Sequence, residues 1–139
     1  MAGYSGTPLI KKLGIKANSR IALINAPANF LSELGNLPDD CTVVSRLGKP
    51  LQFVLIFVKA RRELEKQFEA LAAKITPEGM IWVAWPKKSA GVITDLTFDL
   101  VQKTGLGCGL VDVKICAIDD TWSGLKFVYR LRDRARRSN

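Results

Sequence analysis

Residues Gly79–Gly91 read GMIWVAWPKKSAG, and this stretch carries the main signal for the fold. Six apolar residues, Met80–Trp85, are followed at once by Pro86 and two lysines. A short continuous apolar run of this kind indicates a strand that is covered on both faces, and a proline ends it. We therefore predict the central strand of a parallel sheet, with two lysines and a serine at its carboxyl end.

Strands and helices alternate on either side of this run. Short apolar or β-branched runs predict strands, and apolar residues at helical spacing predict amphipathic helices. The predicted strands are Arg20–Ile24, Cys41–Ser45 and Gln52–Val58; the predicted helices are Leu9–Leu13, a short helix with Phe30, Leu31 and Leu34 inside, Lys59–Ile75 and a segment that begins at Thr94; a turn is predicted at Thr76–Gly79. Leu110–Ile118 and Leu125–Leu131 alternate in polarity, which is typical of a half-exposed hairpin around the loop Asp119–Gly124.

This order predicts an α/β fold with a single open, mostly parallel sheet, helices on both faces and a C-terminal antiparallel hairpin. A chain of 139 residues with 47% hydrophobic residues suits one globular domain, which we assign to residues 1–131. Residues 132–139 are predicted to form a basic, disordered tail. From Arg130 onward the chain has five arginines and one aspartate, so half of its net charge of +8 lies at this end.

Composition excludes several kinds of chemistry. The chain has no histidine, so Ser-His-Asp and Cys-His catalysis and imidazole proton transfer are not available to it. The three cysteines, Cys41, Cys108 and Cys116, form no CxxC pair, which argues against a disulfide framework or a zinc site. No apolar run approaches the ~18 residues of a membrane span, and the first residues do not resemble a signal peptide. We therefore expect a cytoplasmic protein with no membrane partner.

The carboxyl ends of parallel strands meet at one edge of an open α/β sheet, and ligands bind in the crevice outside that edge. The candidate ligand-binding residues are Asn25 after the first strand, Trp85, Lys87, Lys88 and Ser89 at the end of the central strand, and Asp119, Asp120, Thr121 and Trp122 in the hairpin loop. The hairpin loop lies at this edge only if the strand that ends at Ile118 runs parallel to the central strand. On that condition we predict that the two groups face one crevice.

Each candidate also has a simpler structural explanation. Two lysines can bind a phosphate or carboxylate, but they suit a solvated loop equally well. Tryptophan rings can supply flat walls for a base, although packing in the core or at its rim is more common. The paired aspartates can bind magnesium or act as a base, whereas a role in the hairpin turn is the stronger expectation. We assign no metal site and no catalytic residue.

Two resemblances add to this interpretation. TPEGMIWV at Thr76–Val83 and the closing hairpin resemble a shortened class I methyltransferase, which has a Rossmann-type fold that binds S-adenosylmethionine (SAM). MAGYSGTPL at Met1–Leu9, VAWPKKSAG at Val83–Gly91 and DDTWSGLKFV at Asp119–Val128 resemble an uncharacterised bacterial domain-of-unknown-function family. The second resemblance covers nearly the whole chain and implies no activity.

The first resemblance implies SAM binding, but two positions differ from the family pattern. Such proteins place a glycine-rich turn after the first strand and an acidic residue at the end of the second. Here the turn is NAPAN at Asn25–Asn29, which lacks glycine, and the second strand ends in Ser45 and Arg46. We therefore expect no SAM binding and no other cofactor.

The leading hypothesis is a non-catalytic binding or interaction module that recognises an anionic small molecule or a protein partner at the carboxyl edge of the sheet. The alternative is a degenerate or atypical enzyme in the same crevice, either methyltransferase-like or assisted by carboxylates and Mg²⁺. A second alternative is weak nucleic-acid binding through the arginine-rich tail, which has no interleaved aromatic residues to stack on bases.

Overall fold

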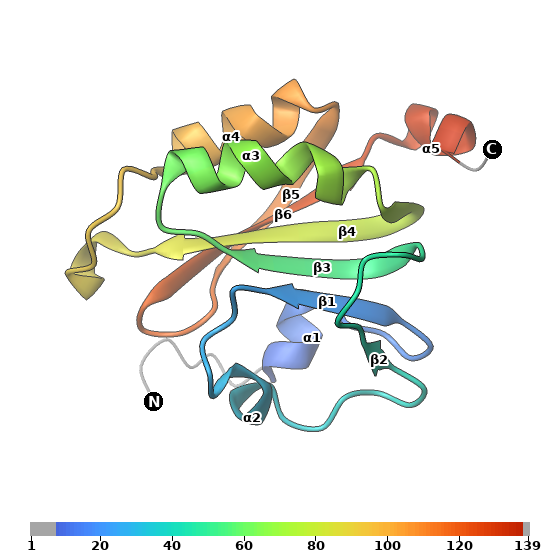
Figure 1. The fold of residues 1–139 in the computed structure, drawn as a ribbon, viewed down its shortest axis with the longest axis horizontal. Coiled ribbons are helices and arrows are strands. Elements are labelled where there is room, and N and C mark those ends of the chain that lie inside the picture. The colour runs from blue at the N-terminus through green and yellow to red at the C-terminus, as the bar shows by residue number, and fades with distance from the viewer. Residues whose placement is uncertain (1–7, 138–139) are drawn as a thin grey trace.

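The computed structural model describes residues 8–137, which form a six-stranded sheet with helices on both faces (Figure 1). The strands are β1 Arg20–Ile24, β2 Thr42–Val43, β3 Leu51–Phe57, β4 Ile75–Pro86, β5 Leu110–Ala117 and β6 Trp122–Tyr129. The helices are α1 Leu9–Leu13, α2 Phe30–Leu34, α3 Arg61–Ala72, α4 Phe98–Gly107, α5 Leu131–Arg137 and the short 3-10 helix η1 Lys88–Ala90. Residues 1–7, which contain most of the first segment quoted for the bacterial family, lie outside the described part.

The strand order is β2-β1-β3-β4-β6-β5. The first four strands in this order are mutually parallel, and β6 is antiparallel to both of its neighbours, β4 and β5. The predicted α/β fold with a mostly parallel sheet and a C-terminal hairpin is thereby confirmed. None of the described helices is long and apolar enough to cross a membrane.

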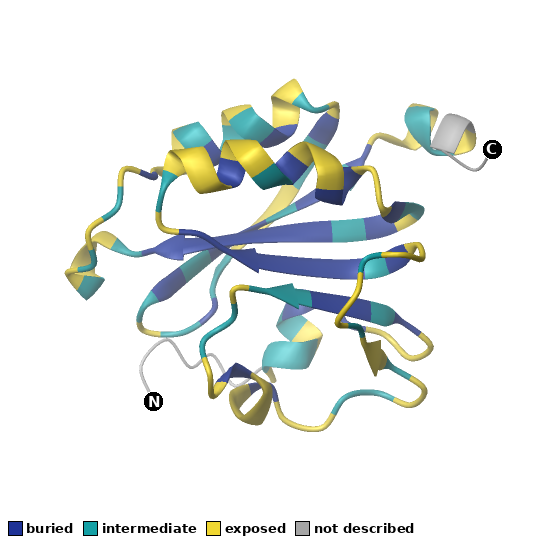
Figure 2. Cartoon of the chain, viewed as in Figure 1, coloured by how far each residue is buried: buried dark blue, intermediate teal, exposed yellow. Residues whose placement is uncertain are grey.

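A hydrophobic core lies on each face of the sheet (Figure 2). On one face α3 lies over the parallel strands and α4 over β5 and β6, and α3 contributes Leu64, Phe68, Leu71 and Ala72 at helical spacing. On the other face α1 and α2 contribute Leu13 and Phe30. Because alternate residues of a strand point to opposite faces, β3 is buried on both, which explains its uninterrupted apolar sequence.

β4 begins earlier than predicted. Ile75 already pairs with Leu51 of β3, and the register then shifts so that Met80 pairs with Phe53. Residues 76–79 therefore form a bulge within the strand, not a separate turn before it. A Cβ atom at Gly79 would lie 3.0 Å from the Leu51 carbonyl oxygen, so the bulge brings the two backbones close together.

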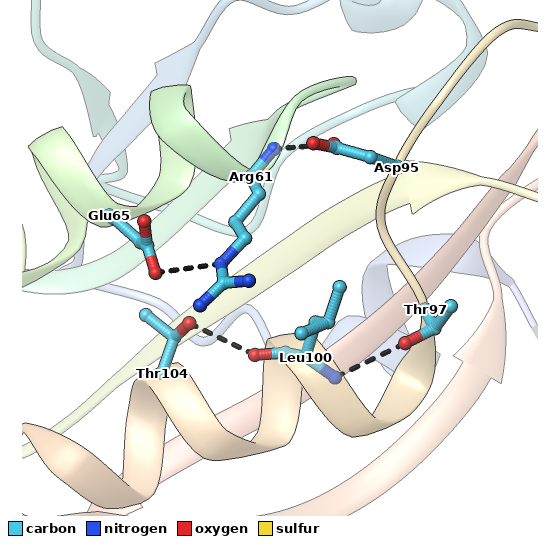
Figure 3. A network of polar contacts seen from close by, with 6 residues as sticks. All are labelled: Arg61, Glu65, Asp95, Thr97, Leu100 and Thr104. Atoms are coloured by element: carbon cyan, nitrogen blue, oxygen red, sulfur yellow. Dashed lines mark hydrogen bonds and ion pairs between the residues drawn. The ribbon is translucent and has the colours of Figure 1, made fainter.

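α4 begins later than predicted, and Thr94 does not cap it. The cap is Thr97, whose hydroxyl accepts a hydrogen bond from the Leu100 amide at 3.3 Å (Figure 3). Thr94 instead donates to the Lys59 carbonyl oxygen. The prediction failed because the polar groups of residues 94–95 bond to the start of the neighbouring helix α3, which local sequence does not reveal.

Other boundaries also differ from the prediction. β2 is shorter than predicted, because only the exposed Thr42 and Val43 are paired with β1; beyond them the Val44 amide donates to the Ile21 carbonyl oxygen. Trp122–Gly124, predicted as loop, belong to β6. Leu31, predicted to face inward, is 51% exposed, since the single turn of α2 buries only its Phe30 and Leu34 side.

The C-terminal segment is helical where a disordered tail was predicted. Residues 131–137 form α5, which lies beyond the end of the sheet where β4 begins (Figure 1). Leu131, predicted to belong to the last strand, is 79% exposed. It lies past the last paired residue, Tyr129, so no strand partner holds it against the core.

The hairpin places two lysines directly opposite each other, Lys114 on β5 and Lys126 on β6. Like charges in this position repel and destabilise a sheet. Burial lowers the pKa of Lys126 below its ordinary value, and the charges of Lys114 and Lys16 lower it further. The folded protein therefore disfavours the charged form of Lys126.

Replacing Lys126 with glutamine should raise the free energy of unfolding by about 0.5 kcal/mol at neutral pH, because the substitution removes this repulsion. The unfolded chain holds the Lys126 proton more tightly than the folded one, so the penalty is complete below the lowered pKa and fades as the pH rises toward 10.5. Urea denaturation at both ends of this range measures the difference. A less stable Lys126→Gln protein at neutral pH would contradict the expectation.

Candidate functional site

A pocket of about 520 Å³ opens at the edge of the sheet where β1 and β3 end. It is lined by Asn25, Pro27, Phe57, Lys59, Glu63 and Trp122. In the strand order β2 and β3 lie on opposite sides of β1, so the direction of winding reverses between β1 and β3. Open α/β sheets bind ligands at such a switch point, outside the carboxyl ends of the strands.

Asn25 gives the turn after β1 its shape. Its φ angle is 60°, in the left-handed region that glycine usually occupies and that asparagine tolerates better than most residues. The side-chain Nδ2 donates to the Phe57 carbonyl oxygen at 3.4 Å and so links the ends of β1 and β3. The turn is therefore made without glycine.

One wall of the pocket is aromatic. Phe57, at the end of β3, packs edge-to-face against Phe30 and Trp122, with ring centroids 5.0 Å apart in both pairs. The three side chains belong to the core beneath α1 and α2. This packing places Phe57 and Trp122 at the pocket, where aromatic rings suit a base or another ring.

The opposite wall carries charge from the start of α3. Glu63 Oε1 accepts hydrogen bonds from the backbone amides of Lys59 and Ala60, both at 3.1 Å. Asp95 Oδ1 accepts from the Arg61 amide at 2.7 Å (Figure 3). The N-terminus of α3 is thus capped by two carboxylates and does not offer these amides to an anion. Both bonds of Glu63 use Oε1, and Oε2 takes no part in them.

The two predicted residue groups are neighbours, as expected. β5 and β4 run in the same direction because β6 is antiparallel to both, so the hairpin loop lies at the carboxyl edge. The Lys87 amide donates to the Thr121 carbonyl oxygen at 2.8 Å. Of the predicted residues, however, only Asn25 and Trp122 line this pocket. Ligand binding by the other candidates stays a prediction.

The two tryptophans do not face the same crevice. Trp85 pairs with Ser123, and Trp122 pairs with Pro86, so Trp85 and Trp122 point to opposite faces of the sheet. Trp85 packs in the core beneath α3 and α4, and Trp122 packs in the other core. The expectation that the two rings form walls of one site is therefore wrong.

Asp119 has the structural role that the turn residues suggested. Its Oδ1 accepts from the amides of Thr121 and Trp122, at 2.8 and 2.9 Å, which closes the hairpin loop. Asp120, Lys88 and Ser89 are exposed. Within residues 8–137 no group of three His, Cys, Asp or Glu side chains could hold a metal ion.

Four pocket residues were not among the sequence candidates: Pro27, Phe57, Lys59 and Glu63. Lys59 lies two residues past β3, so the rule that selected Asn25 could have selected it. Phe57 is indistinguishable from core residues in the sequence. Glu63 lies in the first turn of α3 and is brought to the pocket by the position of that helix.

No family model matches the chain, and no curated protein matches it. Solved structures with a similar fold include a precorrin-6y C5,15-methyltransferase from Geobacter metallireducens, with a TM-score of 0.62 and 12% identity over 88% of this chain and 86% of that one. A SAM-dependent methyltransferase from Aquifex aeolicus matches with a TM-score of 0.59 and 10% identity over 90% and 89% of the two chains. Fibrillarin from Aeropyrum pernix, with natively bound SAM, matches with a TM-score of 0.58 and 12% identity over 91% and 70%.

The chain therefore has the methyltransferase-like form of the Rossmann fold. The comparisons overturn our expectation that SAM and other cofactors play no part, because proteins that use or contain SAM have this fold. The physical error concerned glycine: its absence after β1 does not prevent the turn, because Asn25 adopts the left-handed conformation. The similarity shows the fold alone and gives no support to the leading hypothesis of a non-catalytic binding module.

Proposed function

We propose that the chain is an atypical methyltransferase-like domain that binds SAM in the pocket at the carboxyl ends of β1 and β3. The location of the pocket at the switch point of the sheet carries the proposal. The structural similarity to SAM-dependent proteins supports it. When bound, SAM supplies a methyl group on a positively charged sulfonium.

The residues of the pocket suit the parts of such a molecule. Trp122 and Phe57 offer aromatic rings to a purine, and such rings also attract cations. Glu63 contributes negative charge for the sulfonium and the amino group, and the exposed Lys59 can pair with the carboxylate. β2 ends at Val43 without an acidic residue, so contacts to the ribose differ from the family pattern. This difference makes the domain atypical.

Binding of SAM to the purified chain, measured by calorimetry, tests the proposal. We expect saturable binding and a higher melting temperature, because a ligand that binds only the native state stabilises it. Trp122→Leu should weaken SAM binding by about tenfold, equivalent to the aromatic contact energy of about 1.4 kcal/mol. Lys59→Ala, at an exposed position, should weaken it without loss of stability.

Trp85→Leu is the matched control, because Trp85 is as deeply buried as Trp122 but lies on the opposite face. Its SAM affinity should stay at the wild-type level. Equal losses of SAM affinity in Trp122→Leu and Trp85→Leu would contradict the assignment of SAM to this pocket. Absence of any SAM binding would reject SAM as the ligand. Equally tight binding of ATP would also reject it, because the negative charge of Glu63 should repel the ATP phosphates.

A further inference from the structure

Four lysines gather on the face of the sheet that α1 covers: Lys12 on α1, Lys16 in the loop after it, Lys114 on β5 and Lys126 on β6. Hydrogen bonds connect the elements that carry them. Lys114 Nζ donates to the Lys12 carbonyl oxygen at 2.8 Å, and Lys12 Nζ donates to the Ala117 carbonyl oxygen at 3.1 Å. Lys126 Nζ lies 3.6 Å from the position that a Cβ atom at Gly14 would occupy, at the end of α1. We call these four residues the lysine cluster.

The partners of the lysine cluster are neutral. Lys12 and Lys114 bond to carbonyl oxygens, which fix the ammonium groups in place without cancelling their charge. The charges that lower the pKa of Lys126 are those of Lys114 and Lys16. The ion pair Arg61–Glu65 lies on α3, on the other face. The cluster is therefore a fixed concentration of positive charge.

Stability alone does not account for this arrangement. The directly opposed pair Lys114 and Lys126 repel each other and oppose folding. Lys16 and Lys114 are exposed, and Lys12, Gly14 and Lys126 are partly exposed. Protein interfaces have apolar, aromatic centres, whereas nucleic-acid interfaces are polar and strongly positive. The surface has the chemistry of the second kind.

The lysine cluster lies on the same face of the sheet as Trp122 but does not line the pocket. Trp122, Gly124 and Lys126 alternate on β6, so they share one face of the sheet. Three residues lie between Trp122 and Lys126, a distance of about 13 Å along a strand. Gly124 is buried between them, so the lysine cluster is a surface separate from the pocket.

We propose that the lysine cluster binds the phosphate backbone of a nucleic acid. Lysines that neutralise phosphates release condensed counterions, so the affinity depends steeply on salt. The lysine cluster is separate from the arginine-rich α5, which lies beyond the end of the sheet where β4 begins (Figure 1). The inference does not depend on SAM binding and is tested without SAM.

Fluorescence anisotropy with a short labelled RNA and a DNA of the same sequence tests the proposal. The double variant Lys16→Glu with Lys114→Glu should bind at least about tenfold more weakly, and its salt slope should fall by about 1.4, because two phosphate contacts are lost. Its melting temperature should stay close to that of the wild type, because removal of the Lys114–Lys126 repulsion offsets loss of the hydrogen bond from Lys114 to the Lys12 carbonyl oxygen. A purely structural cluster would instead give a lower melting temperature and unchanged affinity.

Lys66→Glu with Lys103→Glu is the matched control, because both lysines are exposed on α3 and α4 and the change in net charge is identical. Its affinity should stay within about threefold of wild type. Equal losses in the two double variants would overturn the proposal, as would loss of binding only when the chain is shortened to end at Arg130. Competition by polyglutamate as effective as that by RNA would point to an acidic protein partner instead.

Discussion

Replacing Gly105 with alanine is expected to lower the free energy of unfolding by about 3 kcal/mol. Gly105 is buried within α4, and a Cβ atom there would lie 2.0 Å from Cε1 and 2.3 Å from Cδ1 of Phe127. The Phe127 ring is completely buried and packs edge-to-face against Phe68, with centroids 5.4 Å apart. The ring therefore has no free space to move into, and α4 must shift away from β6.

Gly107→Ala is the control for this substitution. Gly107 is in the same helix, and a Cβ atom there would meet nothing within 4 Å. Because alanine favours the helix, Gly107→Ala should leave the stability unchanged or raise it by about 0.5 kcal/mol. Chemical denaturation of both proteins measures the contrast. Similar small effects at the two positions would mean that α4 does not pack on β6 as described.

Replacing Phe57 with alanine is expected to cost about 4 kcal/mol and to remove one wall of the pocket. Phe57 is only 2% exposed and forms edge-to-face contacts with Phe30 and Trp122. A cavity at this position would leave Trp122 without its support. Unfolding curves measure the loss of stability, and SAM titration of the folded fraction measures the loss of binding.

Phe57→Leu separates the effect on the pocket from the effect on the fold. Leucine keeps most of the volume, so the loss of stability should stay below about 1.5 kcal/mol, while the loss of the aromatic edge should reduce SAM affinity by about tenfold. Phe68→Leu, in the core on the other face, should cost similar stability without changing SAM affinity. Equal SAM affinity in the two leucine variants would show that Phe57 does not contribute to the site.

The elements that local sequence predicted well are those whose signal is repeated along the chain. β3 is buried on both faces and reads as an unbroken apolar run, and α3 repeats its apolar residues at helical spacing. The elements predicted poorly depend on a distant partner. Thr94 and Asp95 form hydrogen bonds with the backbone at the start of α3. Ile75 belongs to β4 because it pairs with Leu51 of β3. No local pattern encodes these contacts.

The candidate site divides in the same way. The edge of the sheet followed from the order of strands and helices, because parallel strands end at a common edge. Asn25 was selected by that rule, but its left-handed conformation was not foreseen, since residue type alone does not fix a φ angle. Glu63 reaches the pocket only through the placement of α3.

The amino-acid sequence by itself determined the α/β fold, the parallel sheet and the edge that carries the pocket, because hydrophobic periodicity and chain order are local properties. Only the tertiary structure decided which side chains share that pocket. Side chains alternate along a strand, so the register between β4 and β6 sends Trp85 to one face and Trp122 to the other. A shift of one residue would reverse both assignments, and that register is set by packing across the whole sheet.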